Sequence, residues 1–124
     1  MTTLPPQLKL KLQVYCGAQI AMGPGKADLL EAIDRTGSIS AAGRLLGMSY
    51  RRAWLLVDTM NRCWDQPLVA TRPGGAPGSG AALTESGRRI LAHYRGLQQA
   101  AAHAAHGADW AALAGALRDS PREG

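Results

Sequence analysis

Hydrophobic and polar residues alternate near the start of the chain, where residues 8–14 read LKLKLQV. A period of two is typical of a strand with one buried face. The cysteine and glycine that follow Tyr15 can turn the chain back into a second strand over 18–22, which predicts an N-terminal β-hairpin over residues 8–22. The segment GPG at 23–25 should then break regular structure.

A helical period replaces this alternation, and it predicts three helices over 26–35, 39–46 and 50–64. Gly37 ends the first of them, because glycine readily adopts the left-handed conformation past a helix end. Gly47 separates the second helix from the third. Ser38 and Ser49 stand directly before the second and third helices, where serine is a preferred capping residue. Together the three helices form a head over residues 26–64.

The apolar positions indicate which faces of these helices are buried. On the second helix, Ala42, Leu45 and Leu46 are expected to face inward. The apolar residues of the third helix are spaced so that they share one face. They are Ala53, Leu56, Val57, Met60 and Trp64. The residues elsewhere on that helix include Tyr50, Arg51, Trp54, Leu55, Asp58 and Arg62.

The next predicted elements are two short strands, over 68–72 and 81–83. They flank the segment PGGAPGSG, which is too rich in glycine and proline for helix or sheet. The prediction is a β-ribbon over 68–83 with a glycine-rich tip. Thr84 then caps a long helix that alanines continue to about His106. Asp109 can cap a last short helix, which completes a helical C-terminal region over 84–118.

These elements predict a fold class. The length of 124 residues fits one domain, and apolar residues at 46% of the composition suffice for a packed core. A helix, a short glycine turn and a second helix define a helix-turn-helix, here over 39–64. A ribbon directly after it is typical of the winged variant. We therefore predict a single winged helix-turn-helix domain over residues 1–124, mainly α-helical with small β ribbons.

Charge is distributed unevenly over this predicted fold. The net charge is +5 at pH 7, which favours a polyanionic partner. The arginines of the stretch 38–72 are Arg44, Arg51, Arg52, Arg62 and Arg72, and its acids are Asp58 and Asp65. The acids of the first helix are Asp28, Glu31 and Asp34. The sequence thus separates a basic helix-turn-helix from a more acidic support.

A basic helix-turn-helix suits the major groove of double-stranded DNA, which is wide enough to admit one helix. The third helix would present its N-terminal residues to the bases, so Arg51 and Arg52 are candidate guanine or phosphate ligands. The alternative for both is a solvated helix face. Arg44 is a candidate phosphate contact, because the second helix crosses the DNA backbone. Arg72 at the base of the ribbon would also reach phosphate.

Two aromatic residues accompany the arginines on the third helix. Tyr50 and Trp54 are four residues apart and are therefore neighbours on the helix. They could contact a thymine methyl group or a sugar, or they could brace the helix against the ribbon. Both interpretations remain open at the level of sequence.

Other chemistry finds little support in the sequence. His103 and His106 have no cysteine or carboxylate at matching spacing, so we predict no metal site and no cofactor. Cys16 and Cys63 form no framework and are expected to be reduced thiols. Ser38, Ser40 and Ser49 have no histidine nearby in the sequence, and no phosphate-binding loop is present, so no enzyme is predicted. The absence of a signal peptide and of a long apolar run predicts a soluble cytoplasmic protein without a membrane partner.

Several specific motifs resemble a known family. They are GSISAAGRLLGMSYRRAW, then MN at 60–61, then PLV, a glycine-rich segment and LT at 83–84. The chain over roughly residues 8–100 resembles the N-terminal DNA-binding domain of the ModE family of molybdate-responsive transcription regulators. More distantly, it resembles the winged helix-turn-helix of LysR-type regulators.

This resemblance implies a homodimer that binds a two-fold symmetric operator. It implies that the recognition helix begins at Ser49 and that the C-terminal helical region dimerises the chains. It also places Gly43 at the close contact between the two helices of the motif.

The sequence departs from the family pattern in two respects. ModE-like regulators usually carry C-terminal oxyanion-binding modules, and 124 residues leave no room for one, which argues against molybdate or tungstate sensing in this chain. The family's ribbon often carries a lysine, whereas Ala76 and Pro77 stand here.

The sequence therefore predicts a dimeric, sequence-specific regulator of transcription, acting on molybdenum uptake or use genes through a palindromic operator. The alternative is a protein-interaction adaptor or antagonist that heterodimerises with a full-length regulator. The candidate DNA-binding residues are Ser38, Ser40, Arg44, Ser49, Tyr50, Arg51, Arg52, Trp54, Arg72, Gly74 and Gly75.

Overall fold

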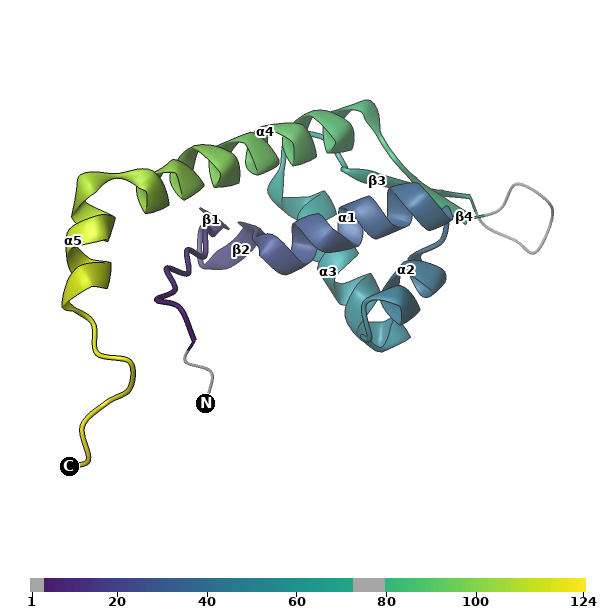
Figure 1. Cartoon of the computed structure of the whole chain (residues 1–124). Coiled ribbons are helices and arrows are strands. Elements are labelled where there is room, and N and C mark those ends of the chain that lie inside the picture. The colour runs from purple at the N-terminus through teal and green to yellow at the C-terminus, as the bar shows by residue number, and fades with distance from the viewer. Residues whose placement is uncertain (1–3, 73–79) are drawn as a thin grey trace. The chain divides into compact units, whose positions relative to one another are not determined.

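The computed structural model describes residues 4–72 and 80–124, and Figure 1 shows its elements. The helices are α1 (Pro24–Thr36), α2 (Ile39–Leu45), α3 (Tyr50–Cys63), α4 (Glu85–Ala102) and α5 (Ala108–Ala116), with a 3-10 segment η1 (His103–His106). The strands are β1 (Val14–Cys16), β2 (Gln19–Met22), β3 (Val69–Arg72) and β4 (Gly80–Leu83). The mainly helical architecture with two small antiparallel ribbons, predicted from the sequence, is confirmed.

The chain divides into two compact units. One is Lys11–Gly96, which contains the hydrophobic core, and the other combines Leu97–Gly124 with the residues before Lys11. The core is built mainly from α1 and α3, with smaller contributions from α2 and the strands. Its largest fully buried side chains are Met22, Leu29, Leu30, Ile33, Val57, Met60 and Leu68. Within the described residues, no helix combines the length and the apolar character that crossing a bilayer requires.

Local capping signals fix the boundaries of the helical head. Gly37 ends α1 with a left-handed backbone (φ 71°), and Gly47 has φ 72° in the turn before α3. The Ser38 hydroxyl oxygen accepts a hydrogen bond of 3.0 Å from the backbone N–H of Ala41. The Ser49 hydroxyl oxygen accepts one of 3.1 Å from the N–H of Arg52. The capping roles predicted for both serines and for Gly37 are confirmed.

The N-terminal segment differs from the prediction. The hairpin pairs Val14–Cys16 with Gln19–Met22, and residues 8–13 form no strand. Leu8 and Leu10 are exposed, whereas Leu12 and Val14 of the same alternation are partly buried against the core. The segment GPG does not break structure throughout, since Pro24 is the first residue of α1. Proline suits this position, where its missing N–H would have no partner inside the helix.

Two expectations for other helices are also wrong. Leu45 and Leu46, expected to face inward, are 55% and 38% exposed. Leu45 is the last residue of α2 and Leu46 its C-cap, whereas the buried residues of α2 all lie earlier in the helix, at Ile39, Ala42 and Gly43. Asp109 does not cap α5, which begins after Gly107 without a side-chain cap. Thr84, by contrast, caps α4 as predicted, because its hydroxyl oxygen accepts from the N–H of Gly87 at 2.9 Å.

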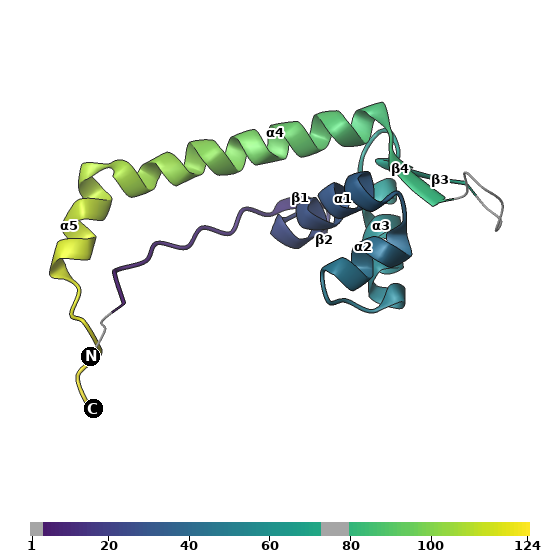
Figure 2. The same ribbon diagram turned by 45° about the vertical axis from the view of Figure 1, so that its right-hand side comes forward.

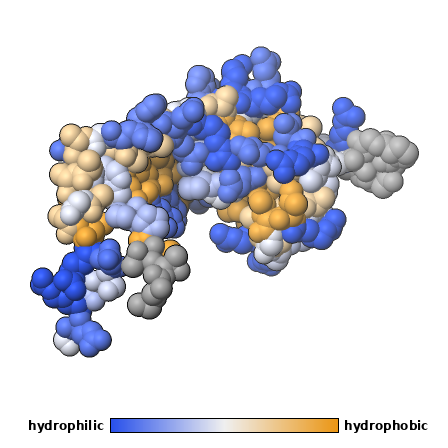
Figure 3. All heavy atoms as spheres, viewed as in Figure 1, coloured by the Kyte–Doolittle hydropathy of each residue, from blue (hydrophilic) through white to orange (hydrophobic). Residues whose placement is uncertain are grey.

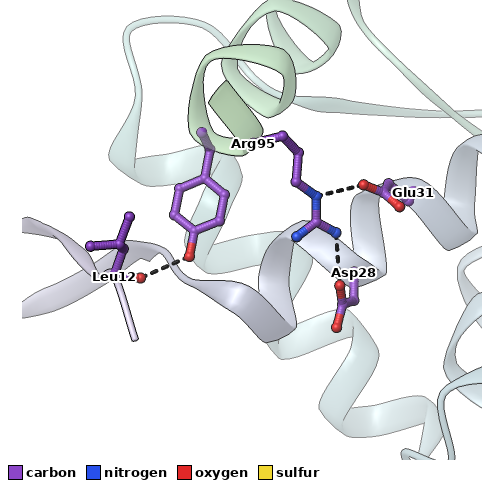
Figure 4. Close-up of polar contacts among 5 residues, drawn as sticks. Leu12, Asp28, Glu31 and Arg95 are labelled. Carbon is purple, nitrogen blue, oxygen red and sulfur yellow. Dashed lines mark hydrogen bonds and ion pairs between the residues drawn. The ribbon is translucent and has the colours of Figure 1, made fainter. Parts of the chain in front are cut away.

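The part of α4 up to Gly96 lies next to α1 in Figures 1 and 2. Polar contacts, drawn in Figure 4, hold this part to α1 and to the segment before β1. The Tyr94 hydroxyl donates to the carbonyl oxygen of Leu12 at 2.8 Å. The Arg95 guanidinium contacts Glu31 at 2.6 Å and Asp28 at 2.7 Å. Two of the acids that crowd α1 therefore anchor α4. These contacts join segments far apart in the sequence, which the local pattern of residues could not indicate.

The β3–β4 ribbon, called the wing below, is tied to α1 through its second strand. Its register pairs Val69 with Leu83 and Arg72 with Gly80. The N–H of Ala81 donates to the carbonyl oxygen of Gly37 at 2.9 Å, so β4 is tied to the end of α1. The residues between the strands lie outside the described part of the chain.

Candidate nucleic-acid interface

The N-terminal end of α3 is exposed. Ser49, Tyr50, Arg51 and Arg52 all lie at the surface, whereas Ala53, Val57 and Met60 of the same helix are buried. The helix therefore presents one face to the core and its front end to solvent. A base-reading helix requires this arrangement, because its first turns must reach into the groove.

A close contact between α2 and α3 sets the angle of the helix-turn-helix. A Cβ atom at Gly43 would lie 3.1 Å from the Cβ of Ala53 and 3.5 Å from the carbonyl oxygen of Met48. The Gly43 carbonyl in turn accepts a hydrogen bond of 2.9 Å from the N–H of Met48. The position that the family resemblance assigned to Gly43 is confirmed.

The two adjacent arginines lie in different surroundings. A shallow, open depression runs along α3, and its lining includes Arg51 but not Arg52. The residues that line it are Tyr50, Arg51, Trp54, Leu55 and Asp58. Arg52 lies near Lys26 of α1, close enough for its charge to act on the Lys26 ammonium group. Burial lowers the pKa of the Lys26 ammonium group, and the nearby positive charge of Arg52 lowers this pKa further.

Tyr50 and Trp54, which both line this depression, form an aromatic pair. Their ring centroids are 6.1 Å apart and their planes meet at 77°, an edge-to-face geometry. Tyr50 is 59% exposed and Trp54 38%. Each ring therefore keeps a free surface for a ligand while it restricts the movement of the other.

Asp58 and Arg62 form an exposed ion pair of 3.0 Å on α3. The Asp58 carboxylate lies on the open face one turn beyond Trp54, and the Arg62 guanidinium partly neutralises its charge. Exposed pairs of this kind contribute little to stability, but the neutralisation reduces repulsion between the carboxylate and a polyanion.

The polar candidates at α2 and at the two helix starts already make hydrogen bonds within the chain. Arg44 is exposed and donates to the hydroxyl oxygen of Ser40 at 2.9 Å, so the two form a joint polar group on the surface of α2. Ser38 and Ser49 each use an oxygen lone pair in capping, and each retains a hydroxyl proton to donate. Ser40 and Arg44 thus lie on α2, and the two capping serines lie directly before α2 and α3.

The wing carries the remaining candidates. Arg72 is exposed at the end of β3, where it pairs with Gly80 across the ribbon. Gly74 and Gly75 lie outside the described residues.

Asn61 is a positioning residue that the sequence analysis did not identify. Its side-chain oxygen accepts from the N–H groups of Leu68 and Val69 at 2.9 and 3.0 Å, and its side-chain nitrogen donates to the carbonyl of Val69 at 3.0 Å. Asn61 thus ties α3 to the first strand of the wing. Leu55 was missed as well, although its place outside the inward stripe was a signal that it would be exposed.

The remaining candidates concern chemistry other than nucleic-acid binding. In the described part of the chain, no group of three or more histidine, cysteine or acidic side chains is placed to hold a metal ion. His103 and His106 pack against each other with ring centroids 6.3 Å apart. Burial raises the pKa of the Cys63 thiol, and a hydrogen bond with Cys16 raises this pKa further.

Comparison with known proteins gives a consistent picture, although no family model matches the chain. The chain is 46% identical over 78 residues to the molybdenum transport protein ModE of Azotobacter vinelandii, covering 63% of this chain and 29% of that protein. It is 47% identical over 77 residues to the molybdenum-pterin-binding protein MopB of Rhodobacter capsulatus, covering 62% and 28%. It is 37% identical over 92 residues to the DNA-binding transcriptional dual regulator ModE of Escherichia coli K12, covering 74% and 34%.

Over this region the chain is homologous to the ModE regulators. The resemblance drawn from the sequence motifs is thereby confirmed. The chain spans about a third of the length of these ModE and MopB relatives.

A solved structure shares the fold. A complex of the CbnR DNA-binding domain with DNA aligns with a TM-score of 0.55 at 18% identity, covering 71% of this chain and 95% of that one. This likeness confirms the winged helix-turn-helix architecture.

Proposed function

We propose that this chain is a sequence-specific, double-stranded DNA-binding regulator of transcription that acts in the cytoplasm without enzymatic chemistry. The observation that carries the proposal is the exposed N-terminal end of α3, with Arg51 in an open depression opposite the buried stripe. In this interpretation α3 enters the major groove. The flanking phosphates are contacted by Ser40 with Arg44, by the two capping serines, and by Arg72 at the base of the wing. Gly74 and Gly75 allow the wing to approach the DNA backbone.

The proposal includes a homodimer on a palindromic operator of molybdenum uptake or use genes. The names of the ModE relatives support the link to molybdenum and to transcription. Exposed leucines of the C-terminal unit support self-association, since Leu97, Leu113 and Leu117 are each more than half exposed. Two α3 helices related by a two-fold axis would contact half-sites about one helical turn, or a multiple of it, apart.

Selection of bound DNA from a random pool tests this function. The expected result is an enriched, two-fold symmetric sequence whose affinity falls steeply as salt rises, because phosphate contacts release counterions. Failure to enrich any sequence at moderate salt would contradict the proposal. In that case, co-purification with a full-length ModE relative would favour the adaptor or antagonist role.

A further inference from the structure

The open face of α3 carries an exposed aliphatic residue whose role the proposed function leaves unassigned. Leu55 is 54% exposed and lines the same depression as Arg51 and Trp54. Figure 3 shows hydrophobic residues gathered on the surface over α2 and α3. Single exposed leucines are common on protein surfaces, but this one shares a face with the charged group most suited to reading a base.

Helix geometry relates Leu55 to Arg51. The two residues are four positions apart, so they lie on the same side of α3, about 6 Å apart along the axis. Successive bases of one DNA strand are about 3.4 Å apart. Leu55 therefore reaches a base within about two steps of the base at Arg51.

The chemistry of the major groove offers one apolar group at this depth. Among the four bases, thymine alone presents a methyl group there, at C5, and apolar side chains recognise it. Asp58, one turn further along, is partly neutralised by Arg62 and does not prevent this approach.

We propose that Leu55 is a specificity-determining residue that packs against the C5 methyl group of a thymine, within about two base steps of the base that Arg51 contacts. The inference rests on the proposed DNA-binding function. It adds a recognised chemical group, and it commits the exposed apolar part of α3 to DNA and not to a protein partner.

The test uses the selected operator with each thymine replaced in turn by deoxyuridine, in both half-sites. This replacement removes the methyl group and leaves the hydrogen-bonding edge intact. At one symmetric position, the wild-type chain should bind about fourfold more weakly per half-site, as expected for the loss of one buried methyl group. Elsewhere on the α3 footprint the replacement should have little effect.

Variants of the full chain link this effect to the side chain. Leu55→Ala should bind the native operator about as weakly as wild type binds the uracil operator, and should lose its sensitivity to uracil. Leu55→Met should retain most of the sensitivity. Leu45→Ala is the matched control, because Leu45 is 55% exposed on α2 outside the depression. It should retain the full sensitivity, and thermal unfolding should show all three variants folded.

A cytosine arm distinguishes a methyl contact from another property of thymine. The wild-type chain should bind an operator with 5-methylcytosine at the sensitive position about fourfold more tightly than one with cytosine there. Leu55→Ala should bind the two operators equally.

The outcomes separate this inference from the function on which it rests. A selected operator with no uracil-sensitive thymine, or one whose sensitivity survives in Leu55→Ala, would overturn the role of Leu55 and leave DNA binding intact. If no operator were selected at all, both proposals would fail. Loss of binding to a protein partner in Leu55→Ala, without any change on DNA, would assign the surface to that partner instead.

Discussion

At the scale of residues, the adjacent arginines of α3 differ because of helix geometry. Successive helical residues are about 100° apart around the axis, so Arg51 lines the open depression and Arg52 does not. Arg52 instead lies near enough to Lys26 for its charge to lower the pKa of that ammonium group. A base reader must share the face that enters the groove. The two side chains are therefore expected to contribute differently to recognition, although both are exposed.

Substitution of the arginines tests this difference. Arg51→Ala should weaken binding to the selected operator by about 1–3 kcal/mol and affect random DNA less, because a bidentate contact to guanine is lost. Arg52→Ala should weaken binding to both DNAs similarly, as expected for loss of general attraction to phosphate. Fluorescence anisotropy titrations give, for each variant, the loss of affinity relative to wild type on the operator and on random DNA. Equal losses on both DNAs for Arg51→Ala would make Arg51 a phosphate contact.

At the scale of elements, contacts made by a few buried or half-buried positions hold the helices and the wing in place. Gly87 of α4 is in direct contact with the backbone carbonyl of Leu68, where a Cβ atom could not be accommodated. Asn61 bonds the backbone of β3 through both atoms of its amide. These contacts fix the base of the wing relative to α3, so that both can meet one stretch of DNA.

Glycine substitutions along α4 should have opposite effects on stability. Gly87→Ala should lower the free energy of unfolding by about 1–3 kcal/mol, because the new methyl group would overlap a backbone oxygen that cannot easily move. Gly96→Ala on the same helix is the matched control. Its Cβ would meet open space, so the variant should gain up to about 1 kcal/mol from helix propensity. Urea unfolding compares the two, and equal behaviour would show that the contact at Leu68 does not constrain α4.

Loss of the Asn61 amide should affect the wing and the core together. Asn61→Ala leaves the buried N–H of Val69 without its partner, and should lower the free energy of unfolding by about 1–3 kcal/mol. Asn61→Asp keeps the two acceptor bonds but loses the donor to Val69. Its free energy of unfolding should therefore lie between those of the wild type and of Asn61→Ala. Hydrogen exchange at Val69 checks the site directly. An unchanged exchange rate in Asn61→Ala would contradict the role given to the amide.

The parts of this fold that the sequence predicted depend on local signals. Gly37, Ser38 and Ser49 act on backbone groups within a few residues, so the helix boundaries could be read from neighbours alone. The alternation around Leu8 and Leu10 predicted a strand, but a strand also needs a hydrogen-bonding partner elsewhere in the fold, which the alternation does not reveal. The described strand pairing begins only at Val14. The split between Arg51 and Arg52 also depends on α1, and no local pattern places Lys26 beside α3.

At the scale of the whole molecule, the proposed regulator needs a second copy to read a symmetric site. The C-terminal unit carries leucines without a covering partner among the described residues, notably Leu113 and Leu117, which are 64% and 55% exposed. A dimer would bury this apolar surface and would double the DNA contacts made by a single α3.

Charge placed on the C-terminal unit should disrupt such a dimer. Sedimentation equilibrium should show the wild-type chain as a dimer and Leu113→Glu as largely monomeric, because the dimer would have to bury an unpaired carboxylate. Loss of the dimer should lower the affinity of Leu113→Glu for the operator, while the binding of each head to random DNA should change little. Leu45→Glu, at a comparably exposed leucine on α2, should leave the dimer unchanged. A wild-type chain that sediments as a monomer at operator-saturating concentrations would contradict the dimeric model.

The central claim is that the open face of α3 reads base pairs. The most direct measurement is the ratio of dissociation constants for the selected operator and for a shuffled sequence of the same length and composition, at one salt concentration. We expect the operator to bind at least about 10³-fold more tightly, with Arg51→Ala reducing the ratio. Equal affinity for the two DNAs would contradict the claim.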